Sequence, residues 1–410
     1  MSKYLKITCS CIIISLGIYT PLTHASDAEG EFHGYYRAGV GMNSKGSRSQ
    51  ECFGLQGIPK YRFGNECDIY GEFSYTKELA KSNNGTSFVG TAMVIGSTPT
   101  SNYDDATLRL SQLALEVKNM KELEGGTLWL GKRFYYTSIH ILDLKYVDLD
   151  GVGIGIDNLP FGPGKLSYGL YRSDISNDFT STRHNLIYKD IPTNKDGKLD
   201  IYTAFIRGNR SMINSHDGGS VSLVHTQKNN WGGENVLGIQ YGSGPGIGNT
   251  AQQMGTAGDV TQGNDFKRAR AFDSFTWQMT PKWGGAVATV LQKDKIPMGT
   301  QTWFTVGGRS SYAATQNIKF IVDAGRDQIQ PATNGATQRL NKVTFAVAYA
   351  KDPSFWARPE LRFFITMAKW NDAAQAAANL AAPGSALSST GTFGSQLHGH
   401  TVGVQLETWF

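Results

Sequence analysis

The chain ends in the stretch His400-Thr401-Val402-Gly403-Val404-Gln405-Leu406-Glu407-Thr408-Trp409-Phe410. Successive side chains of a strand point to opposite faces. One face then holds Val402, Val404, Leu406 and Phe410, and the other holds Thr401, Gln405, Glu407 and Trp409. An apolar outer face, a polar inner face and a final aromatic residue are typical of a transmembrane β-barrel. Trp409 is the exception, because hydrophobicity alone would not place an indole on a wet inner wall. The stretch therefore predicts a pore with an aromatic lining, and hence a ligand.

The first 25 residues are typical of a secretory signal peptide. Lys3 and Lys6 form a positive start, residues 12–19 are apolar, and Ala25 ends a small-residue cleavage site. The alternative is a short buried N-terminal helix. We expect residues 1–25 to be removed and residues 26–410 to form one domain. That domain has no run of the ~20 apolar residues that a membrane-spanning helix needs.

Charge and cysteine content limit the possible partners. The chain has 39 basic and 34 acidic side chains, and loss of Lys3 and Lys6 leaves 37 against 34. A net charge of +3 argues against nucleic acid. Cys52 and Cys67 remain after cleavage as one possible disulfide in an oxidising compartment, and the alternative is two free buried thiols. Neither has a partner at zinc-site spacing.

Period-two alternation recurs elsewhere, in residues 32–40, 62–75, 142–146 and 355–367. Each segment carries charge on one face only. A Lys or Arg that faces lipid at mid-bilayer costs ~2–4 kcal/mol, so the charged faces are expected to line a lumen. Backbone groups in a membrane must also find partners, which predicts an all-β fold closed into one antiparallel barrel.

The intervening segments predict loops and turns. Residues 242–264 and 371–394 are the largest loops, and residues 82–85 and 194–197 are turns. A helix-forming run at 373–382 is expected as a loop insertion. Glycine-rich pieces at 151–155 and 242–246 open no helix after a strand, which argues against a nucleotide loop. His398 and His400 could hold a metal, but two loop histidines are usually solvated, so we expect no metal and no cofactor.

The inward faces carry the functional candidates. Tyr35, Tyr70, Trp356 and Trp409 share these faces with charged residues, including Arg358 and Glu360. A pyranose has an apolar C–H face that suits aromatic rings and a rim of hydroxyls that suits ionic groups. A row of aromatics beside a row of ions would guide a sugar, with weak sites that also release it. The alternative is that these aromatics belong to the interfacial girdles, whose residues should share a face with Val, Leu and Phe.

Several ordered blocks resemble the maltoporin and sucrose-porin family. They are Phe32-His-Gly-Tyr35-Tyr-Arg37-Ala-Gly, Lys60-Tyr-Arg62-Phe-Gly-Asn65-Glu-Cys67-Asp-Ile-Tyr70-Gly-Glu72, Gly131-Lys-Arg-Phe-Tyr135, Phe355-Trp356-Ala-Arg358-Pro and Glu407-Thr-Trp409-Phe410. These blocks are spread over nearly the whole mature chain. Residues 173–301 match the family only in short fragments.

The resemblance implies an 18-stranded outer-membrane barrel with an in-folded constriction loop, which trimerises and passes oligosaccharides by diffusion. It implies an aromatic slide of Tyr35, Tyr70, Trp356 and Trp409. Tyr103 is the nearest counterpart of a slide residue donated by a neighbouring subunit, and Trp231 is the candidate for a mid-chain slide aromatic. The implied polar tracks are Arg37, Arg62, Glu72, Asp143 and Arg109. The early-loop disulfide of the family maps onto Cys52 and Cys67.

The chain departs from the family at the throat. After Tyr135 it has Tyr136-Thr137-Ser138-Ile139, one residue shorter than the family and without its Arg and Asp. Lys145 stands where the family has a constricting tyrosine. A different or broader sugar range is therefore expected, unless Lys145 is an ordinary lumen charge paired with Asp143.

We expect a carbohydrate channel with no catalytic step, in contact with outer-membrane lipid. The first alternative is a general diffusion porin whose aromatics are incidental. A barrel hydrolase would need a Ser or Cys nucleophile beside His, and no such motif is evident. An adhesin is disfavoured by the inward tryptophans.

Overall fold

The computed structural model describes residues 29–46, 49–175 and 178–410. The expected signal peptide at 1–25 lies outside these residues. Within the part described, no helix combines the length and the apolar character needed to cross a membrane.

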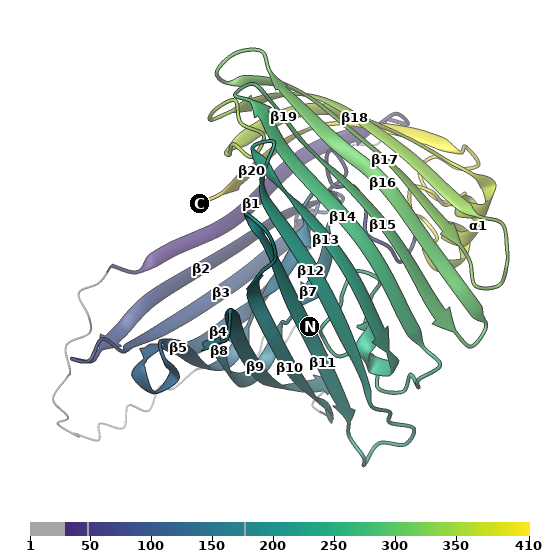
Figure 1. Ribbon diagram of the computed structural model, residues 1–410. Helices are drawn as coiled ribbons and strands as arrows, with labels where there is room; N and C mark the ends of the chain where they lie inside the picture. Colours follow the sequence, from purple (N-terminus) through teal and green to yellow (C-terminus); the bar gives the residue numbers. More distant parts are fainter. Residues whose placement is uncertain (1–28, 47–48, 176–177) are drawn as a thin grey trace, which may run out of the picture.

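The described residues fold almost entirely into strands (Figure 1). The strands are β1 (Glu31–Asn43), β2 (Asp68–Lys81), β3 (Ser87–Pro99), β4 (Thr107–Met120), β5 (Gly126–Arg133), β6 (Tyr136–Ile139), β7 (Leu144–Asp148), β8 (Gly151–Phe161), β9 (Gly164–Ile175), β10 (Asp178–Pro192), β11 (Gly197–Gly208), β12 (Gly218–Asn230), β13 (Gly233–Ser243), β14 (Lys267–Thr280), β15 (Trp283–Ile296), β16 (Gly299–Ala313), β17 (Ile318–Gln330), β18 (Gln338–Ala350), β19 (Glu360–Trp370) and β20 (His398–Trp409). The helices are the 3₁₀ turns η1 (Lys121–Leu123) and η2 (Gly244–Ile247) and the α-helix α1 (Asp372–Ala381).

Eighteen of these strands form one closed antiparallel barrel, which confirms the predicted fold. Each strand pairs with its neighbours in sequence, and β20 pairs with β1 to close the sheet. The closing register sets Tyr35 opposite Trp409. The order departs from the sequence at β5, which pairs with β8. The two strands between them in the sequence, β6 and β7, form a separate hairpin.

The two ends of the barrel differ in the length of their connections. One end has short connections such as 82–86, 193–196 and 231–232, which include both predicted turns. The other end has the long loops 44–67, 134–150, 244–266 and 371–397, with α1 in the last of them (Figure 1). The loop positions predicted from composition are therefore correct, and the helix-forming run is an insertion within a loop.

The terminal strand has the two faces that its sequence predicts. Val402 is 38% exposed and Phe410 is 51% exposed on the outer side, whereas Glu407 is 2% exposed on the inner side. The same alternation holds in β1, where Phe32 and Val40 are exposed and Arg37 points to the inside. The outer face is therefore apolar around the barrel wall.

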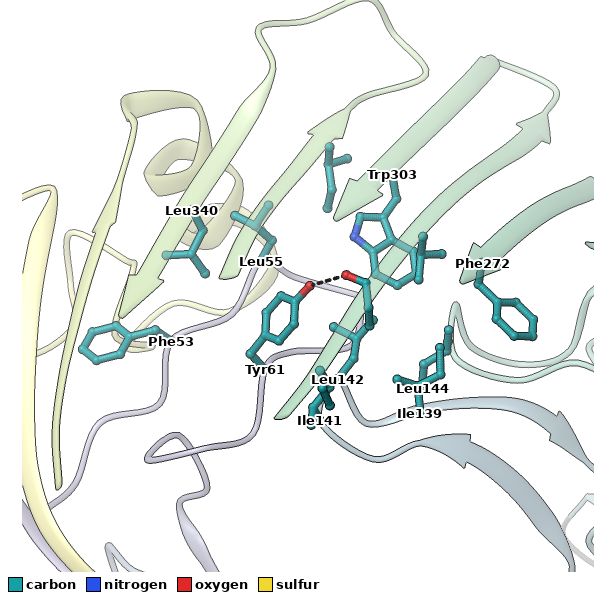
Figure 2. Close-up of a cluster of buried hydrophobic side chains, with 14 of the residues drawn as sticks. Phe53, Leu55, Tyr61, Ile139, Ile141, Leu142, Leu144, Phe272, Trp303 and Leu340 are labelled. Carbon is teal, nitrogen blue, oxygen red and sulfur yellow. Dashed lines mark hydrogen bonds between the residues drawn. The ribbon is translucent and has the colours of Figure 1, made fainter. Parts of the chain in front are cut away.

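The prediction that residues 142–146 form a wall strand is wrong. They belong to the β6–β7 hairpin, which folds into the barrel, and Leu142 and Leu144 are fully buried there. Their apolar face packs on inward residues of the wall such as Phe272 and Trp303 (Figure 2). The charged face of the hairpin was predicted correctly as a lumen face, but its apolar face meets protein rather than lipid.

The loop between β1 and β2 also folds inward. Phe53, Leu55 and Tyr61 from this loop join the same buried cluster (Figure 2). Because β2 begins only at Asp68, Arg62 is a loop residue and not part of the strand predicted over 62–75. The strand predicted over 355–367 likewise begins only at Glu360, so Phe355, Trp356 and Arg358 lie in the β18–β19 connection, where Phe355 is buried rather than outward.

Candidate functional site

A cavity of about 290 Å³ lies inside the barrel between the β6–β7 hairpin and the wall formed by β1, β2 and β20. It brings together eight of the residues predicted from sequence, namely Tyr35, Tyr70, Trp409, Arg37, Arg62, Glu72, Asp143 and Lys145. Four further residues complete its lining: Tyr136, Ser138, His140 and Gln252.

The wall side of the cavity carries the aromatic rings. Tyr35 and Tyr70 come from neighbouring strands, and their ring centres are 6.0 Å apart. Tyr70 donates a 2.5 Å hydrogen bond to Glu72, and Tyr35 donates a 2.8 Å hydrogen bond to Glu407. Because each hydroxyl is bound by a carboxylate, the orientation of both rings is fixed.

Arginines stand beside these rings. The guanidinium of Arg37 lies 4.7 Å from the centre of the Tyr70 ring, and Arg62 donates a 2.8 Å hydrogen bond to the Tyr35 hydroxyl. Both arginines pair with Glu66, at 3.1 Å and 2.6 Å. Burial alone would raise the pKa of Glu66, but Arg62 and Arg37 hold it below its usual value. Glu66 therefore stays ionised and fixes the two cations along the path.

The position of Arg62 depends on the fold of its loop. Asn65 is fully buried and donates to the carbonyls of Phe53 and Tyr61, which ties the loop together. Gly64 has a φ of +61°, and a Cβ there would lie 2.4 Å from Thr366 Oγ1. Glycine permits both this backbone conformation and the close contact with the wall.

A disulfide fastens the end of the same loop. Cys52 and Cys67 are joined, with Cα atoms 5.9 Å apart. The alternative of two free buried thiols does not hold in this structure. The bond encloses Arg62 and Glu66, so it stabilises the segment that presents them to the cavity.

The hairpin side of the cavity is polar and aromatic. Asp143 lies at its tip with a φ of +58°, a left-handed conformation that Asp adopts more readily than most residues. The ammonium of Lys145 lies 4.0 Å from the centre of the Tyr136 ring. No ion pair joins Lys145 to Asp143 in the described residues, so the alternative of a Lys145–Asp143 pair is wrong.

His140 separates this cavity from a second one of about 120 Å³, and it lines both of them together with Ser138. Its ring lies edge-on to Trp409 at 6.0 Å and to Trp356 at 5.6 Å. Burial, together with Arg62, lowers the pKa of His140 to about 4, so it is neutral at pH 7. The two tryptophan rings are themselves 6.3 Å apart, which continues the aromatic row from Tyr35 to Trp356.

Arg358 and Glu360 lie behind the cavity wall rather than on its surface. Arg358 is 2.7 Å from Glu407 and stacks 4.6 Å from the centre of the Trp409 ring. Glu360 is buried and pairs with Lys319 at 2.5 Å. Of the two residues predicted as part of a polar track, Arg358 thus supports Trp409 and Glu407 from behind, and Glu360 lies 3.7 Å from Arg358.

Three other predicted residues are not in the cavity. Arg109 lies exposed on β4, and Tyr103 lies 47% exposed in the β3–β4 loop. Trp231 lies in the β12–β13 turn, with its ring 5.6 Å from Phe275. Phe275 is on the side of β14 opposite to Ser274, which lines the second cavity, so Trp231 does not face the lumen of its own barrel.

The sequence analysis did not select Glu66, Glu407, Tyr136, Ser138, His140 or Gln252. Glu407 had been placed on the inward face, and Glu66 lies inside a quoted block between Arg62 and Cys67, so both carried a signal. Gln252 comes from the 244–266 loop, and no pattern in that loop indicates that it reaches the cavity. Among the described residues, no group of three His, Cys, Asp or Glu is arranged to hold a metal ion.

The closed barrel with an internal polar path defines a channel of the outer-membrane porin class. A family model described as LamB porin matches residues 31–410, and the chain belongs to this family. It is therefore a multi-pass outer-membrane protein that acts as a diffusion channel rather than an enzyme. In such barrels the short turns face the periplasm and the long loops face outward.

Solved porins share the fold at low sequence identity. OccK2 (OpdF) of Pseudomonas aeruginosa matches with a TM-score of 0.53 and 9% identity, over 93% of this chain and 98% of that chain. OccAB1 of Acinetobacter baumannii matches with a TM-score of 0.51 and 10% identity, over 93% and 96% of the two chains. At these identities the likeness concerns the fold alone.

Proposed function

We propose that this protein conducts oligosaccharides across the outer membrane by diffusion, along a slide formed by Tyr70, Tyr35, Trp409 and Trp356. The observation that carries the proposal is that Tyr70, Tyr35 and Trp409 line the first cavity beside charged groups, and that Trp356, 6.3 Å from Trp409, lines the second. The rings suit the C–H faces of a sugar, and the charged groups suit its hydroxyls.

The arrangement also favours transit over tight binding. The ring of Tyr70 lies 6.0 Å from that of Tyr35, and the ring of Trp409 lies 6.3 Å from that of Trp356. Tyr35 and Trp409 are register partners on β1 and β20, so a sugar can leave one pair of rings as it meets the next. Conduction requires sites that bind well enough to admit a solute and weakly enough to release it. The gradient and removal of the sugar in the periplasm would supply the driving force.

We further propose that the channel is a homotrimer and that Tyr103 extends the slide of a neighbouring subunit. In its own chain Tyr103 is exposed at the long-loop end and outside the cavity, which supports such a role. Tyr103→Ala should weaken sugar binding in the assembled trimer, with the assembly itself unchanged in native mass spectrometry. Equal sugar binding by Tyr103→Ala and wild type would remove Tyr103 from the slide.

The test of the slide is Trp409→Ala, examined by current block in planar bilayers. Stacking on one ring contributes about 0.5–1.5 kcal/mol, so the sugar concentration for half block should rise by roughly two- to tenfold. The ion conductance should stay similar or rise, because alanine fills less of the channel than tryptophan does. Unchanged sugar block would contradict the slide.

Sugar preference is the second part of the proposal. By the family resemblance, Lys145 stands where maltoporins carry a constricting tyrosine. Lys145→Tyr should narrow the throat and shift permeation toward maltodextrins. The measurement is the ratio of maltose to sucrose flux into proteoliposomes, and an unchanged ratio would show that Lys145 does not set selectivity.

The competing function is general diffusion of small hydrophilic solutes. It requires the aromatic rings to be incidental to transport. A general porin would show no saturable block by any sugar. The proposed channel would show saturable block by the sugars that it conducts.

A further inference from the structure

The hairpin presents an aromatic ring of its own to the cavity. Tyr136, at the start of β6, lines the cavity from the hairpin side, whereas Tyr35 and Tyr70 line it from the wall side. The opposite face of the hairpin, with Leu142 and Leu144, is buried against the wall. The docking of that apolar face therefore fixes which face, and which ring, is turned toward the path.

Two contacts hold Tyr136 in place. The ammonium of Lys145 lies 4.0 Å from the centre of the Tyr136 ring, and Phe134 packs edge-on against it with 5.1 Å between ring centres. Lys145 comes from β7, where it is the register neighbour of Ser138, two residues from Tyr136 on the paired strand. The ring of Tyr136 is thus supported by a lysine on the adjacent strand of the hairpin.

We propose that Tyr136 is a specificity-determining residue, which turns the one-sided slide at the throat into a two-sided aromatic slot for flat, unbranched sugars. This inference rests on the proposed function and adds a substrate class to it. A ring that stacks on one aromatic surface needs only one face free of axial groups. A ring that passes between two aromatic surfaces needs both faces free.

The chemistry of the slot predicts a preference among epimers. Glucose in its β-pyranose chair carries all its substituents equatorially, so both faces expose C–H groups. Galactose differs by one axial hydroxyl, which projects from one face and holds that face away from an aromatic ring. The slot should therefore favour gluco-configured residues over galacto-configured ones and exclude rings that carry a branch.

The experiment measures D-glucose and D-galactose entry into proteoliposomes, because the two sugars have the same mass and differ at one carbon. Wild type should pass glucose several-fold faster than galactose. Tyr136→Ala should reduce this preference by about two- to tenfold, in line with the loss of one stacking surface. Tyr136→Phe keeps the ring and should retain the preference.

Two further variants separate the ring from its support. Lys145→Met removes the ammonium and keeps the length of the side chain, so it should lower the preference less than Tyr136→Ala. Glu122→Ala removes an exposed side chain of the η1 turn, outside both cavities, and should behave as wild type. The ion conductance of each variant reports that its barrel is folded and open.

The outcomes distinguish this inference from the proposed function. Equal glucose and galactose entry in wild type, or the same preference in Tyr136→Ala as in wild type, would overturn the slot. If such a channel still showed saturable block by an oligosaccharide, only the aromatic slot would be contradicted, and the proposed sugar channel would remain supported. Absence of any sugar block in wild type would overturn both.

Discussion

The terminal strand β20 and the β6–β7 hairpin share one sequence pattern, the alternation of apolar and polar residues, but they have opposite surroundings. Both alternate apolar and polar residues, with Val402 and Val404 on one face of β20, and Leu142 and Leu144 on one face of the hairpin. In β20 the apolar face is exposed at the outside of the barrel. In the hairpin the apolar face is fully buried inside it.

The difference shows what alternation can establish. A period of two indicates that a segment separates an apolar from a polar environment. It does not say whether the apolar environment is lipid or protein. Here the inner wall supplies the second environment, because Ala286, Ala288 and Val290 on β15 are buried beneath the hairpin.

The largest effect should come from placing a charge on each apolar face. Val404→Arg puts a cation in the lipid-facing belt and should destabilise the barrel by about 2–4 kcal/mol. Leu144→Arg should instead leave the barrel folded and release the hairpin, because a buried unpaired charge opposes docking. Unfolding in urea should detect the first change, and an increase in single-channel conductance should detect the second. A globally unfolded Leu144→Arg would show that the hairpin is part of the wall's stability.

The next effect concerns the other in-folded segment, the loop that carries Arg62. Removal of the Cys52–Cys67 bond by Cys52→Ala with Cys67→Ala should cost roughly 3 kcal/mol in the chain-entropy model, since 15 positions separate the two residues. The cost should appear as local opening, measured by faster hydrogen exchange at residues 49–67, with β20 unchanged. Mass spectrometry of the purified wild type without reductant should show the bond, and free thiols there would contradict it.

The smallest effect should be a pH dependence at the base of the hairpin. Burial, aided by the neighbouring Asp148, raises the pKa of Asp150 to about 7. A carboxyl group whose pKa is higher in the folded state stabilises that state at low pH, and this contribution is lost as the pH rises through about 7. Current fluctuations should therefore grow as the pH rises from about 4 to about 7, and level off above that.

Asp150→Asn is the matched control for this dependence. The amide is close in shape to the protonated carboxyl and cannot ionise, so the fluctuations should be low at both pH values. Fluctuations that still grow with pH in Asp150→Asn would assign the dependence to another group.

The sequence predicted the wall better than the interior, for a physical reason. In the wall strands, residues such as Phe32 and Val402 face lipid, and residues such as Arg37 and Glu407 face the lumen. The membrane therefore requires apolar and polar residues to alternate along each wall strand. Tyr35, Tyr70 and Trp409 could be found because they break the pattern by lying on a polar face. Arg62 was found through a family block and Trp356 through the alternation over 355–367, although both segments were wrongly predicted as strands.

The residues that escaped prediction belong to loops whose course depends on tertiary packing. His140 and Tyr136 reach the path because Leu142 and Leu144 dock on the wall, which no local pattern reveals. Gln252 reaches it because the 244–266 loop bonds to buried groups of the wall, such as Arg268, whose guanidinium binds the carbonyl of Ile247 at 2.7 Å. These contacts join segments far apart in the chain, so a single sequence does not expose them.

The central claim is that the aromatic row binds sugar as it passes. The most direct test is the current through wild-type channels titrated with cellotriose, a β-1,4-linked glucose trimer with equatorial ring substituents, beside a polyethylene glycol of similar mass. The account predicts that the sugar closes the current along a saturable curve, whereas the glycol reduces it only in proportion to its concentration. The same proportional decrease with both solutes would contradict a sugar-binding path.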